Sequence, residues 1–251
     1  MNFVSKATVK AALNKLQGQA AVRASVASTA LVTPHMRRII FVGKSLEPFA
    51  KGGPAQWVKI PFPVRDGGRP VARAYTVRCW DPETSSLAID FALHASSGPA
   101  SAWAERAAVG DQVEIVGPRH GHSVRPEVAW RLLAGDETAL SAIAAILEVL
   151  PQTDRPFVFI EVPTPEDRQS LTAPPSAEIR WLPRSEHKTQ PGERFADAVC
   201  GMSLPPGDGQ VFLAGEARAV RRIRDYASHS VGSVSIDAKG YWLFGTSCYR
   251  G

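Results

Sequence analysis

The sequence predicts two folds in series, a six-stranded antiparallel β-barrel followed by an α/β domain with a parallel sheet. From about residue 20 to residue 116, short β-rich segments are split by turn residues at the intervals typical of small barrels. From Trp130 onward, buried strand-like runs alternate with helical stretches, which indicates strand–helix–strand units and a sheet covered on both faces. The pattern changes from β-rich segments to alternating strands and helices near residues 121–129. We interpret residues 118–126, which begin and end with proline, as a linker.

We therefore predict an N-terminal extension at residues 1–19, a barrel domain at 20–122 and an α/β domain at 128–251. A chain of 251 residues is long enough to bury a core in two domains of ordinary size. The extension carries three lysines between small apolar residues, but lacks the continuous apolar segment and cleavage site of a secretory signal. A short amphipathic helix is expected there.

Each barrel strand is predicted from a β-rich segment that ends at turn residues. The predicted strands are 21–30, 36–42, 55–61, 72–79, 87–93 and 112–116. One helix, at residues 100–107, interrupts them. Pro99 suits the first helical position, because a residue there needs no N–H donor.

In the second half of the chain, short apolar runs predict strands, and the longer stretches between them predict helices. The predicted strands are 131–135, 157–162, 177–182 and 210–215, and the predicted helices are 137–150, 194–200 and 216–228.

Composition excludes several classes of protein. The content of 44% hydrophobic and 21% charged residues is that of a globular protein, and no apolar run reaches the roughly 20 residues of a bilayer span. Cys79, Cys200 and Cys248 are too few and too irregular for a disulfide framework or a metal site, so a reducing cytoplasm is expected. The net charge of +5, without a Lys/Arg run, favours anionic small molecules over nucleic acid or a membrane.

Arg73 and Tyr75 are two residues apart on a predicted strand, so their side chains share one face, whereas Thr76 points the other way. A cation beside an aromatic ring on one strip suits a flat, phosphorylated ligand. The plain alternative is a strand with a surface arginine and a half-buried tyrosine.

The segment Ser97-Gly98-Pro99-Ala100-Ser101 begins the predicted helix and supplies the other half of such a site. The free backbone N–H groups of a helix start, together with the positive end of its dipole, attract an anion. The alternative is simply a good helix start.

Arg73-x-Tyr75-Thr76 followed by Gly98-x-x-Ser101 resembles the flavin fingerprint of the ferredoxin-NADP reductase superfamily. The longer string Ile-Asp-Phe-Ala-Leu-His at 89–94, then Gly-Pro-Ala-Ser-x-Trp-Ala at 98–104, resembles one branch of it, the siderophore-interacting proteins, which are FAD-dependent ferric-siderophore reductases. The resemblance covers residues 20–245 and implies an FAD-binding barrel and a ferredoxin-reductase-like α/β domain that binds NADH or NADPH.

The resemblance also implies roles for single residues. Arg73 would bind the FAD diphosphate, Tyr75 would pack against the isoalloxazine ring, and Thr76 would hydrogen-bond near its reactive N5. The remaining cofactor contacts in the barrel would come from His94, Ser97, Gly98, Ala100 and Ser101. For His94 a purely structural hydrogen bond is an equal alternative, with Asp90 as its support.

Gly135-Asp136-Glu137-Thr138-Ala139 takes the place of the glycine-rich turn that grips nicotinamide nucleotides in the wider superfamily. It has one glycine and two acids, and two carboxylates would repel a pyrophosphate. The resemblance implies that Asp136 and Thr138 face FAD instead. The alternative is that Asp136 caps the following helix.

The nicotinamide side is assigned to Gly215, Glu216 and Glu161, because ligands of open α/β sheets bind beyond the carboxyl ends of strands. The helix after Glu216 carries four arginines, which form either a solvated face or a contact to a nucleotide phosphate. These are Arg218, Arg221, Arg222 and Arg224.

Gly240-Tyr241-Trp242-x-x-Gly245 resembles the ending of the same family, in which an aromatic residue returns toward the flavin. Trp242 or Tyr241 would then shield the isoalloxazine ring, whereas core packing is the alternative.

The resulting hypothesis is an NAD(P)H-dependent, FAD-containing reductase that releases iron as Fe(II) from a ferric siderophore, with no protein ligand to the metal. The chemistry is flavin-mediated, and no catalytic side chain is assigned. For an anionic siderophore we name Lys44 and Arg250 as substrate contacts, and further cations are available at Lys51, Lys59, Arg65 and Arg69. The alternatives are a reductase that works with ferredoxin, flavodoxin or free flavin, and a non-enzymatic siderophore-binding protein.

Overall fold

In the computed structural model of this chain, the described residues are 21–63, 70–94, 98–187, 189–229, 232–246 and 249. The chain divides into two compact units, residues 1–121 and 122–251. The helix expected in the extension at 1–19 lies outside the described residues. The same holds for five residues named above, Arg65, Arg69, Ser97, Cys248 and Arg250.

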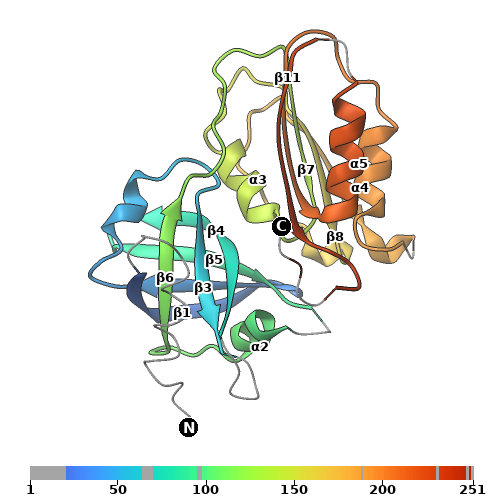
Figure 1. Ribbon diagram of the computed structural model, residues 1–251. Coiled ribbons are helices and arrows are strands. Elements are labelled where there is room, and N and C mark those ends of the chain that lie inside the picture. Colours follow the sequence, from blue (N-terminus) through green and yellow to red (C-terminus); the bar gives the residue numbers. More distant parts are fainter. Residues whose placement is uncertain are drawn as a thin grey trace. The chain divides into compact units, whose positions relative to one another are not determined.

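The first unit contains a closed barrel with the strand order β1-β2-β5-β4-β3-β6, and all its neighbouring strands are antiparallel (Figure 1). The six-stranded antiparallel barrel is thereby confirmed. Its strands are β1 (Ala21–Thr33), β2 (Met36–Val42), β3 (Trp57–Phe62), β4 (Val71–Asp81), β5 (Ser86–Ala92) and β6 (Gln112–Arg119). A short 3-10 helix, η1 (Glu47–Lys51), lies between β2 and β3 and was not predicted; it is anchored by the buried ring of Phe49.

Strand β6 differs from the prediction at its end. The sequence predicts a stop at Val116, because Gly117 and Pro118 follow. The strand instead continues to Arg119, which pairs with Trp57 of β3. A register shift in this pair between Trp57 and Lys59 accommodates the irregular residues.

Alternation along the strands builds the barrel core. On β3, Val58, Ile60 and Phe62 are buried, while the side chains between them are partly exposed. The helix α2 (Pro99–Arg106) adds Trp103, whose ring centroid lies 5.3 Å from that of Phe62 and 5.8 Å from that of Phe91. These ring contacts hold α2 against the barrel.

The second unit is a five-stranded sheet with the order β11-β10-β7-β8-β9, in which every neighbouring pair is parallel. The predicted parallel α/β fold is confirmed. The strands are β7 (Trp130–Gly135), β8 (Phe157–Val162), β9 (Glu178–Pro183), β10 (Gly209–Glu216) and β11 (Val234–Trp242). Strand β11 was not predicted, because this edge strand contains Asp, Lys and Gly and is only partly buried.

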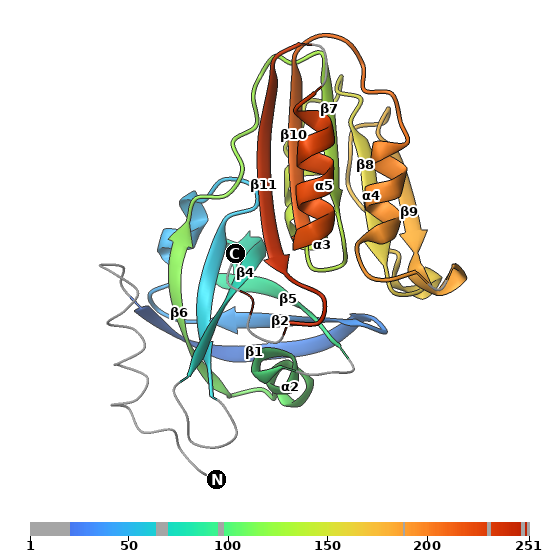
Figure 2. The same cartoon turned by 45° about the vertical axis from the view of Figure 1, so that its right-hand side comes forward.

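Helices cover both faces of this sheet, with α4 and α5 on one face and α3 on the other (Figures 1 and 2). Their bounds are α3 (Leu140–Leu147), α4 (Glu193–Cys200) and α5 (Ala217–Ala227), and two 3-10 turns are η2 (Pro165–Asp167) and η3 (Arg184–Glu186). Within the described ranges, no helix combines the length and the apolar character that crossing a bilayer requires. At the carboxyl ends of these strands, Asp136 directly follows β7, Glu161 is the last residue but one of β8, and Glu216 is the last residue of β10.

The aromatic cluster of the barrel generates a prediction about stability. Phe91 is fully buried and contacts the rings of Tyr75, Phe62 and Trp103. Phe91→Ala should lower the free energy of unfolding by about 3–5 kcal/mol, because it removes a buried ring and leaves a cavity. Urea unfolding measures this loss. The control Val109→Ala, at a residue that is 70% exposed, should change it by less than about 0.5 kcal/mol; equal effects of the two substitutions would contradict the assignment of this core.

Candidate functional site

The strip on β4 carries Arg73, Tyr75 and Thr76. The Tyr75 ring is half-buried; its centroid lies 4.4 Å from that of Phe91, and it meets Phe62 edge-on at 6.0 Å. Burial raises the pKa of the Tyr75 phenol well above its ordinary value, and the Arg73 guanidinium opposes this rise only in part, so the phenol stays neutral. Tyr75 as a whole remains partly accessible, as contact with a flat ligand requires.

The structure brings the end of β5 to the start of α2. The backbone N–H of His94 donates to the Oγ of Ser101 at 3.3 Å, so the two predicted site residues are in contact. Helix α2 begins at Pro99, as predicted, and the N–H of Ala102 donates to the Gly98 carbonyl at 3.0 Å. The N–H groups of Ala100 and Ser101 precede this first intrahelical bond and point out of the helix start.

These barrel residues fit the FAD that the resemblance implies. One guanidinium and two helix-start amides are donors suited to a diphosphate, and a partly exposed phenol suits a flat ring. Asp90 does not disturb this donor set, because both its oxygens accept hydrogen bonds from Arg38, at 2.7 and 2.8 Å. Sequence reasoning missed this cross-strand pair and assigned Asp90 to the support of His94.

A second feature of the barrel is a basic-aromatic cluster formed by Trp57, Lys59 and Arg119. The Lys59 Nζ lies 6.0 Å and the Arg119 Cζ 5.0 Å from the centroid of the Trp57 ring, within the range of cation–π attraction. The Trp57 Nε1 donates to the His120 carbonyl at 2.9 Å, which fixes the ring. The Nε of Arg119 is buried, and it has no hydrogen-bond partner within the described part of the chain.

The cluster identifies which cations of the barrel converge. Lys59 was named only as one available cation, and Arg119 was missed, because the predicted strand ended before it. A usable signal was present: Trp57 and Lys59 are two residues apart on a strand and so share a face. Lys44, the predicted substrate contact, follows β2 and is exposed.

In the second unit, Asp136 is fully buried at the end of β7 and connects three chain segments. Its Oδ1 accepts the N–H and the Oγ1–H of Thr138, at 2.9 and 2.5 Å. Its Oδ2 accepts the N–H of Glu216 at 2.7 Å and the indole N–H of Trp242 at 2.9 Å. Gly215 has a φ of +129°, and a Cβ there would lie 2.4 Å from this Oδ2, so only glycine fits.

Glu161, at the end of β8, is also fully buried. Its carboxylate accepts the N–H of Gly192 at 2.7 Å and that of Phe195 at 3.2 Å, at the start of α4. Arg184 donates to Glu161 at 3.1 Å and binds both oxygens of Glu137 at 2.7 and 2.9 Å. Burial raises the pKa of Glu161, and the hydrogen bonds and Arg184 oppose the rise.

Glu216, at the end of β10, caps α5. Its Oε2 accepts the N–H of Arg218 at 2.7 Å and that of Ala219 at 2.9 Å, while its Oε1 accepts the N–H of Phe244 at 3.2 Å. Among the predicted nicotinamide-side residues, Glu216 therefore lies at the start of α5. Glu161 is buried and accepts a hydrogen bond from the Gly192 N–H, just before α4. Trp242 is held by Asp136, and Tyr241 is 37% exposed.

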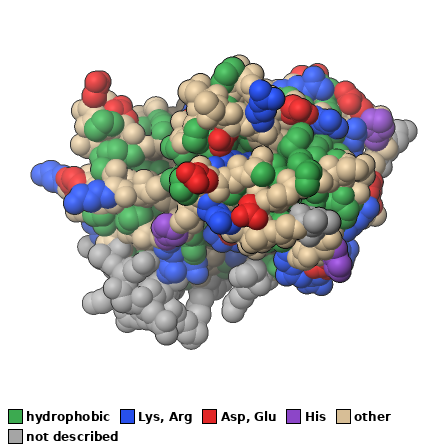
Figure 3. Space-filling view, turned by 90° about the horizontal axis from the view of Figure 1, so that it is seen from above, with side chains coloured by type: hydrophobic (Ala, Val, Ile, Leu, Met, Phe, Trp, Pro, Cys, Tyr) green, Lys and Arg blue, Asp and Glu red, His purple; other side chains and the backbone are tan. Residues whose placement is uncertain are grey.

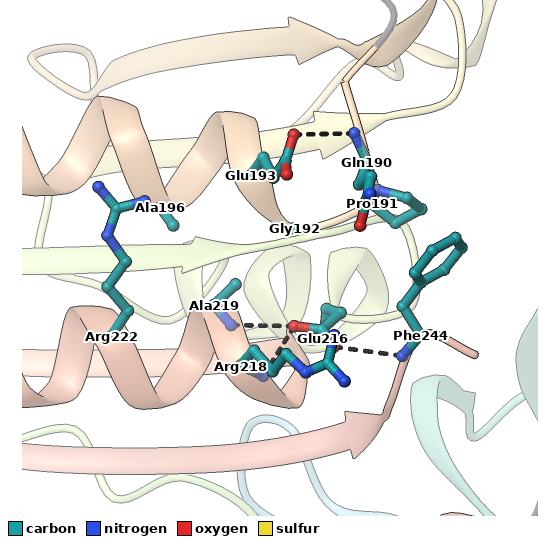
Figure 4. A pocket seen from close by; sticks show the side chains of 10 residues that line it. All are labelled: Gln190, Pro191, Gly192, Glu193, Ala196, Glu216, Arg218, Ala219, Arg222 and Phe244. Atoms are coloured by element: carbon teal, nitrogen blue, oxygen red, sulfur yellow. Dashed lines mark hydrogen bonds between the residues drawn. The ribbon is translucent and has the colours of Figure 1, made fainter. Parts of the chain in front are cut away.

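A cavity of about 210 Å³ opens between the first turns of α4 and α5 (Figure 4). It is lined by Gln190, Pro191, Gly192, Glu193, Ala196, Glu216, Arg218, Ala219, Arg222 and Phe244. Gly192 brings the two helix starts close together, since a Cβ on it would lie 3.0 Å from the Cβ atoms of Glu216 and Ala219. On the face drawn in Figure 3, acidic and basic side chains are interspersed.

Comparisons with known proteins agree with this architecture. Residues 64–122 match the family model described as the siderophore-interacting FAD-binding domain, and residues 128–245 match the one described as siderophore-interacting protein. The ferric vibriobactin reductase ViuB of Vibrio cholerae is 30% identical over 235 residues, which cover 85% of this chain and 86% of that protein.

The NADPH-dependent ferric-chelate reductase of Escherichia coli is 27% identical over 232 residues, covering 84% of this chain and 88% of that protein. The crystal structure of a siderophore utilization protein from T. fusca is 31% identical, with a TM-score of 0.77 over 90% of this chain and 94% of that one. The resemblance predicted from the fingerprint at residues 73–104 is confirmed.

Asp136 generates a prediction about pH. Burial, reinforced by the neighbouring Glu137, raises the pKa of Asp136 to about 7, although Thr138 and Trp242 donate to it. In the unfolded chain the pKa is about 4, so between about pH 4 and pH 7 the native state binds more protons, and this contribution to stability is lost as the pH rises.

Asp136→Asn should remove this pH dependence. It should also lower the free energy of unfolding by about 1–3 kcal/mol, because the amide NH₂ faces N–H donors. Urea unfolding at pH 5, 6, 7 and 8 measures the difference between wild type and variant, and this difference should shrink toward pH 8. The control Asp225→Asn, at an exposed carboxylate, measures the effect of the same substitution at the surface. Parallel curves for wild type and Asp136→Asn would refute the shifted pKa.

Proposed function

Because the chain belongs to the family of siderophore-interacting proteins, we propose that it is an FAD-dependent oxidoreductase that takes electrons from NADH or NADPH and reduces the Fe(III) of a siderophore. The observation that carries this proposal is the match of both units to that family, with relatives named as a ferric vibriobactin reductase and an NADPH-dependent ferric-chelate reductase. The donor set of Arg73, Ala100 and Ser101 supports it.

The barrel residues bind and orient the cofactor. Arg73 and the helix-start amides of α2 would hold the diphosphate, Tyr75 would exclude water from one ring face, and Thr76 would hold a hydrogen bond at the reactive nitrogen. When bound, FAD supplies the conversion from a two-electron donor to one-electron reduction. Since this chemistry resides in the cofactor, the protein contributes position and charge.

The Trp57–Lys59–Arg119 cluster is the proposed contact for an anionic ferric siderophore. Two cations beside an aromatic ring attract a negatively charged, partly aromatic chelate. Reduction to Fe(II) weakens its binding by hard oxygen ligands, so iron is released without a protein ligand. We place this reaction in the cytoplasm, where the nicotinamide donors are made and where a free thiol such as that of Cys200 persists.

The proposed function predicts a spectroscopic cycle. Purified protein loaded with FAD should be yellow, NADH or NADPH should bleach the absorbance near 450 nm under anaerobic conditions, and a ferric siderophore should restore it faster than air does. Bleaching by reduced ferredoxin alone would make ferredoxin the donor. If the loaded protein is bleached by none of these donors, the reductase function is refuted.

Lys59→Ala combined with Arg119→Ala should lower kcat/KM for an anionic ferric siderophore about tenfold at low salt, with a smaller loss at high salt because salt screens these partly exposed charges. Stopped-flow reoxidation of the reduced flavin measures this. The matched control is Arg23→Ala, an exposed cation on β1, and a neutral ferric chelate serves as the control substrate. An equal loss with the neutral chelate would show that the cluster does not act through charge.

A further inference from the structure

The buried carboxylate of Asp136 anchors the end of β11, although it lies in a different part of the chain, directly after β7. Two of the hydrogen bonds that it accepts come from Thr138, and a third comes from the backbone N–H of Glu216. The fourth comes from the indole N–H of Trp242, the last residue of β11, at 2.9 Å. Since an indole N–H can only donate, it needs an acceptor such as this carboxylate.

A second carboxylate fixes the residues that follow β11. Glu216 accepts the N–H of Phe244 at 3.2 Å, and the N–H of Thr246 donates to the Leu243 carbonyl at 3.0 Å. We call residues 242–246 the C-terminal turn. A side chain therefore holds its first residue, and a backbone hydrogen bond holds its middle.

The C-terminal turn and the residue before it present aromatic side chains. Tyr241 is 37% exposed and Phe244 is 42% exposed, and Trp242 lies between them in the chain. The register of β11 with β10 passes over one residue between Gly240 and Trp242, and such a bulge re-aims side chains. An aromatic surface that is held by two buried carboxylates suits a flat ring, because its position and its orientation are both fixed.

We propose that Asp136 is a positioning residue of the reductase reaction, which holds the Trp242 indole and the C-terminal turn in the orientation that reduction of the bound flavin requires. The inference rests on the proposed function, because Trp242 is assigned there to the isoalloxazine ring through the resemblance. Asp136 is buried and accepts four hydrogen bonds from the chain itself, so it acts through Trp242 and does not touch the reacting atoms. A displacement of about 1 Å among groups that orient a reaction can slow it by about 100-fold.

A double-mutant cycle in the FAD-loaded protein tests whether Asp136 acts through the indole. Asp136→Asn removes the charge that accepts the N–H, and Trp242→Phe removes the N–H but keeps an aromatic ring. Each should lower the rate constant of flavin bleaching at saturating NADH or NADPH about tenfold, with less than about a threefold change in the Kd of the donor. The double variant should lose about as much as either single variant, because both substitutions break the same hydrogen bond.

Asp167→Asn is the matched control for the loss of a buried carboxylate. Asp167 is 2% exposed and accepts the N–H and the hydroxyl of Thr164 at 3.1 and 3.0 Å, as Asp136 does with Thr138. These bonds lie within the turn η2. Asp167→Asn should lower stability, because it leaves donors unsatisfied, but should change the bleaching rate constant by less than about twofold.

An NMR measurement tests the same hydrogen bond without turnover. In protein labelled with [15N]tryptophan, the Trp242 indole resonance is the one of six that Trp242→Phe removes. In wild type it should move upfield as the pH falls through about 7, where burial and the neighbouring Glu137 place the pKa of Asp136, because the indole then loses a charged acceptor. In Asp136→Asn this response should vanish. The other charged groups around this site are the same in both proteins, namely Glu137, Glu161, Glu216 and Arg184.

Additive losses in the double variant would overturn the inference, and so would a Trp242 resonance with the same pH response in wild type and Asp136→Asn. If Asp136→Asn does not fold, Trp242→Phe still decides, because an unchanged bleaching rate constant in that variant would refute the role of the indole. Failure of the proposed function gives a different result, namely loaded wild-type protein that NADH and NADPH do not bleach, while the NMR response of Trp242 persists.

Discussion

The second unit depends on three carboxylates buried at the carboxyl ends of its strands. Removing an ion from water costs several kcal/mol, and the cost is recovered only where hydrogen bonds satisfy it. Asp136, Glu161 and Glu216 each accept at least three hydrogen bonds, most of them from backbone N–H groups at or near helix starts. Each carboxylate therefore fixes the angle at which a helix leaves the sheet, and it cannot be replaced without leaving several donors unsatisfied.

The candidate site residues of the barrel are hydrogen-bond donors, in contrast to the acceptor carboxylates of the second unit. These donors are the Arg73 guanidinium and the amides of Ala100 and Ser101, and the nearby Asp90 is neutralised by Arg38. The aromatic cluster around Phe91 supports both halves of this set, because it contacts Tyr75 on β4 and Trp103 on α2. The candidate residues of the barrel thus present donors that suit an anionic ligand, whereas donors at the helix starts of the second unit bind the chain's own carboxylates.

The sequence predicts well what depends on local pattern. The barrel strands, the parallel sheet and the helix start at Pro99 follow from alternation, apolar runs and proline placement. It fails where a pairing partner decides the outcome: β11 is a strand because β10 pairs with it, and Arg119 belongs to a strand although Gly117 and Pro118 precede it. The hydrogen-bond donors of Asp136 could not be predicted from local pattern either, since one of them, Trp242, lies 106 residues away along the chain.

The two kinds of anion site in this chain also differ in their response to salt. Hydrogen bonds from buried amides to Glu161 or Asp136 are shielded from solvent, and ions in solution change them little. A surface charge such as the exposed guanidinium of Arg218 attracts anions through water, and an interaction of about 1 kcal/mol there weakens further as the ionic strength rises. Because the amides at these helix starts are occupied by carboxylates of the chain itself, the hydrogen bonds that order this edge of the sheet should persist at ionic strengths that weaken contacts made by exposed guanidinium groups.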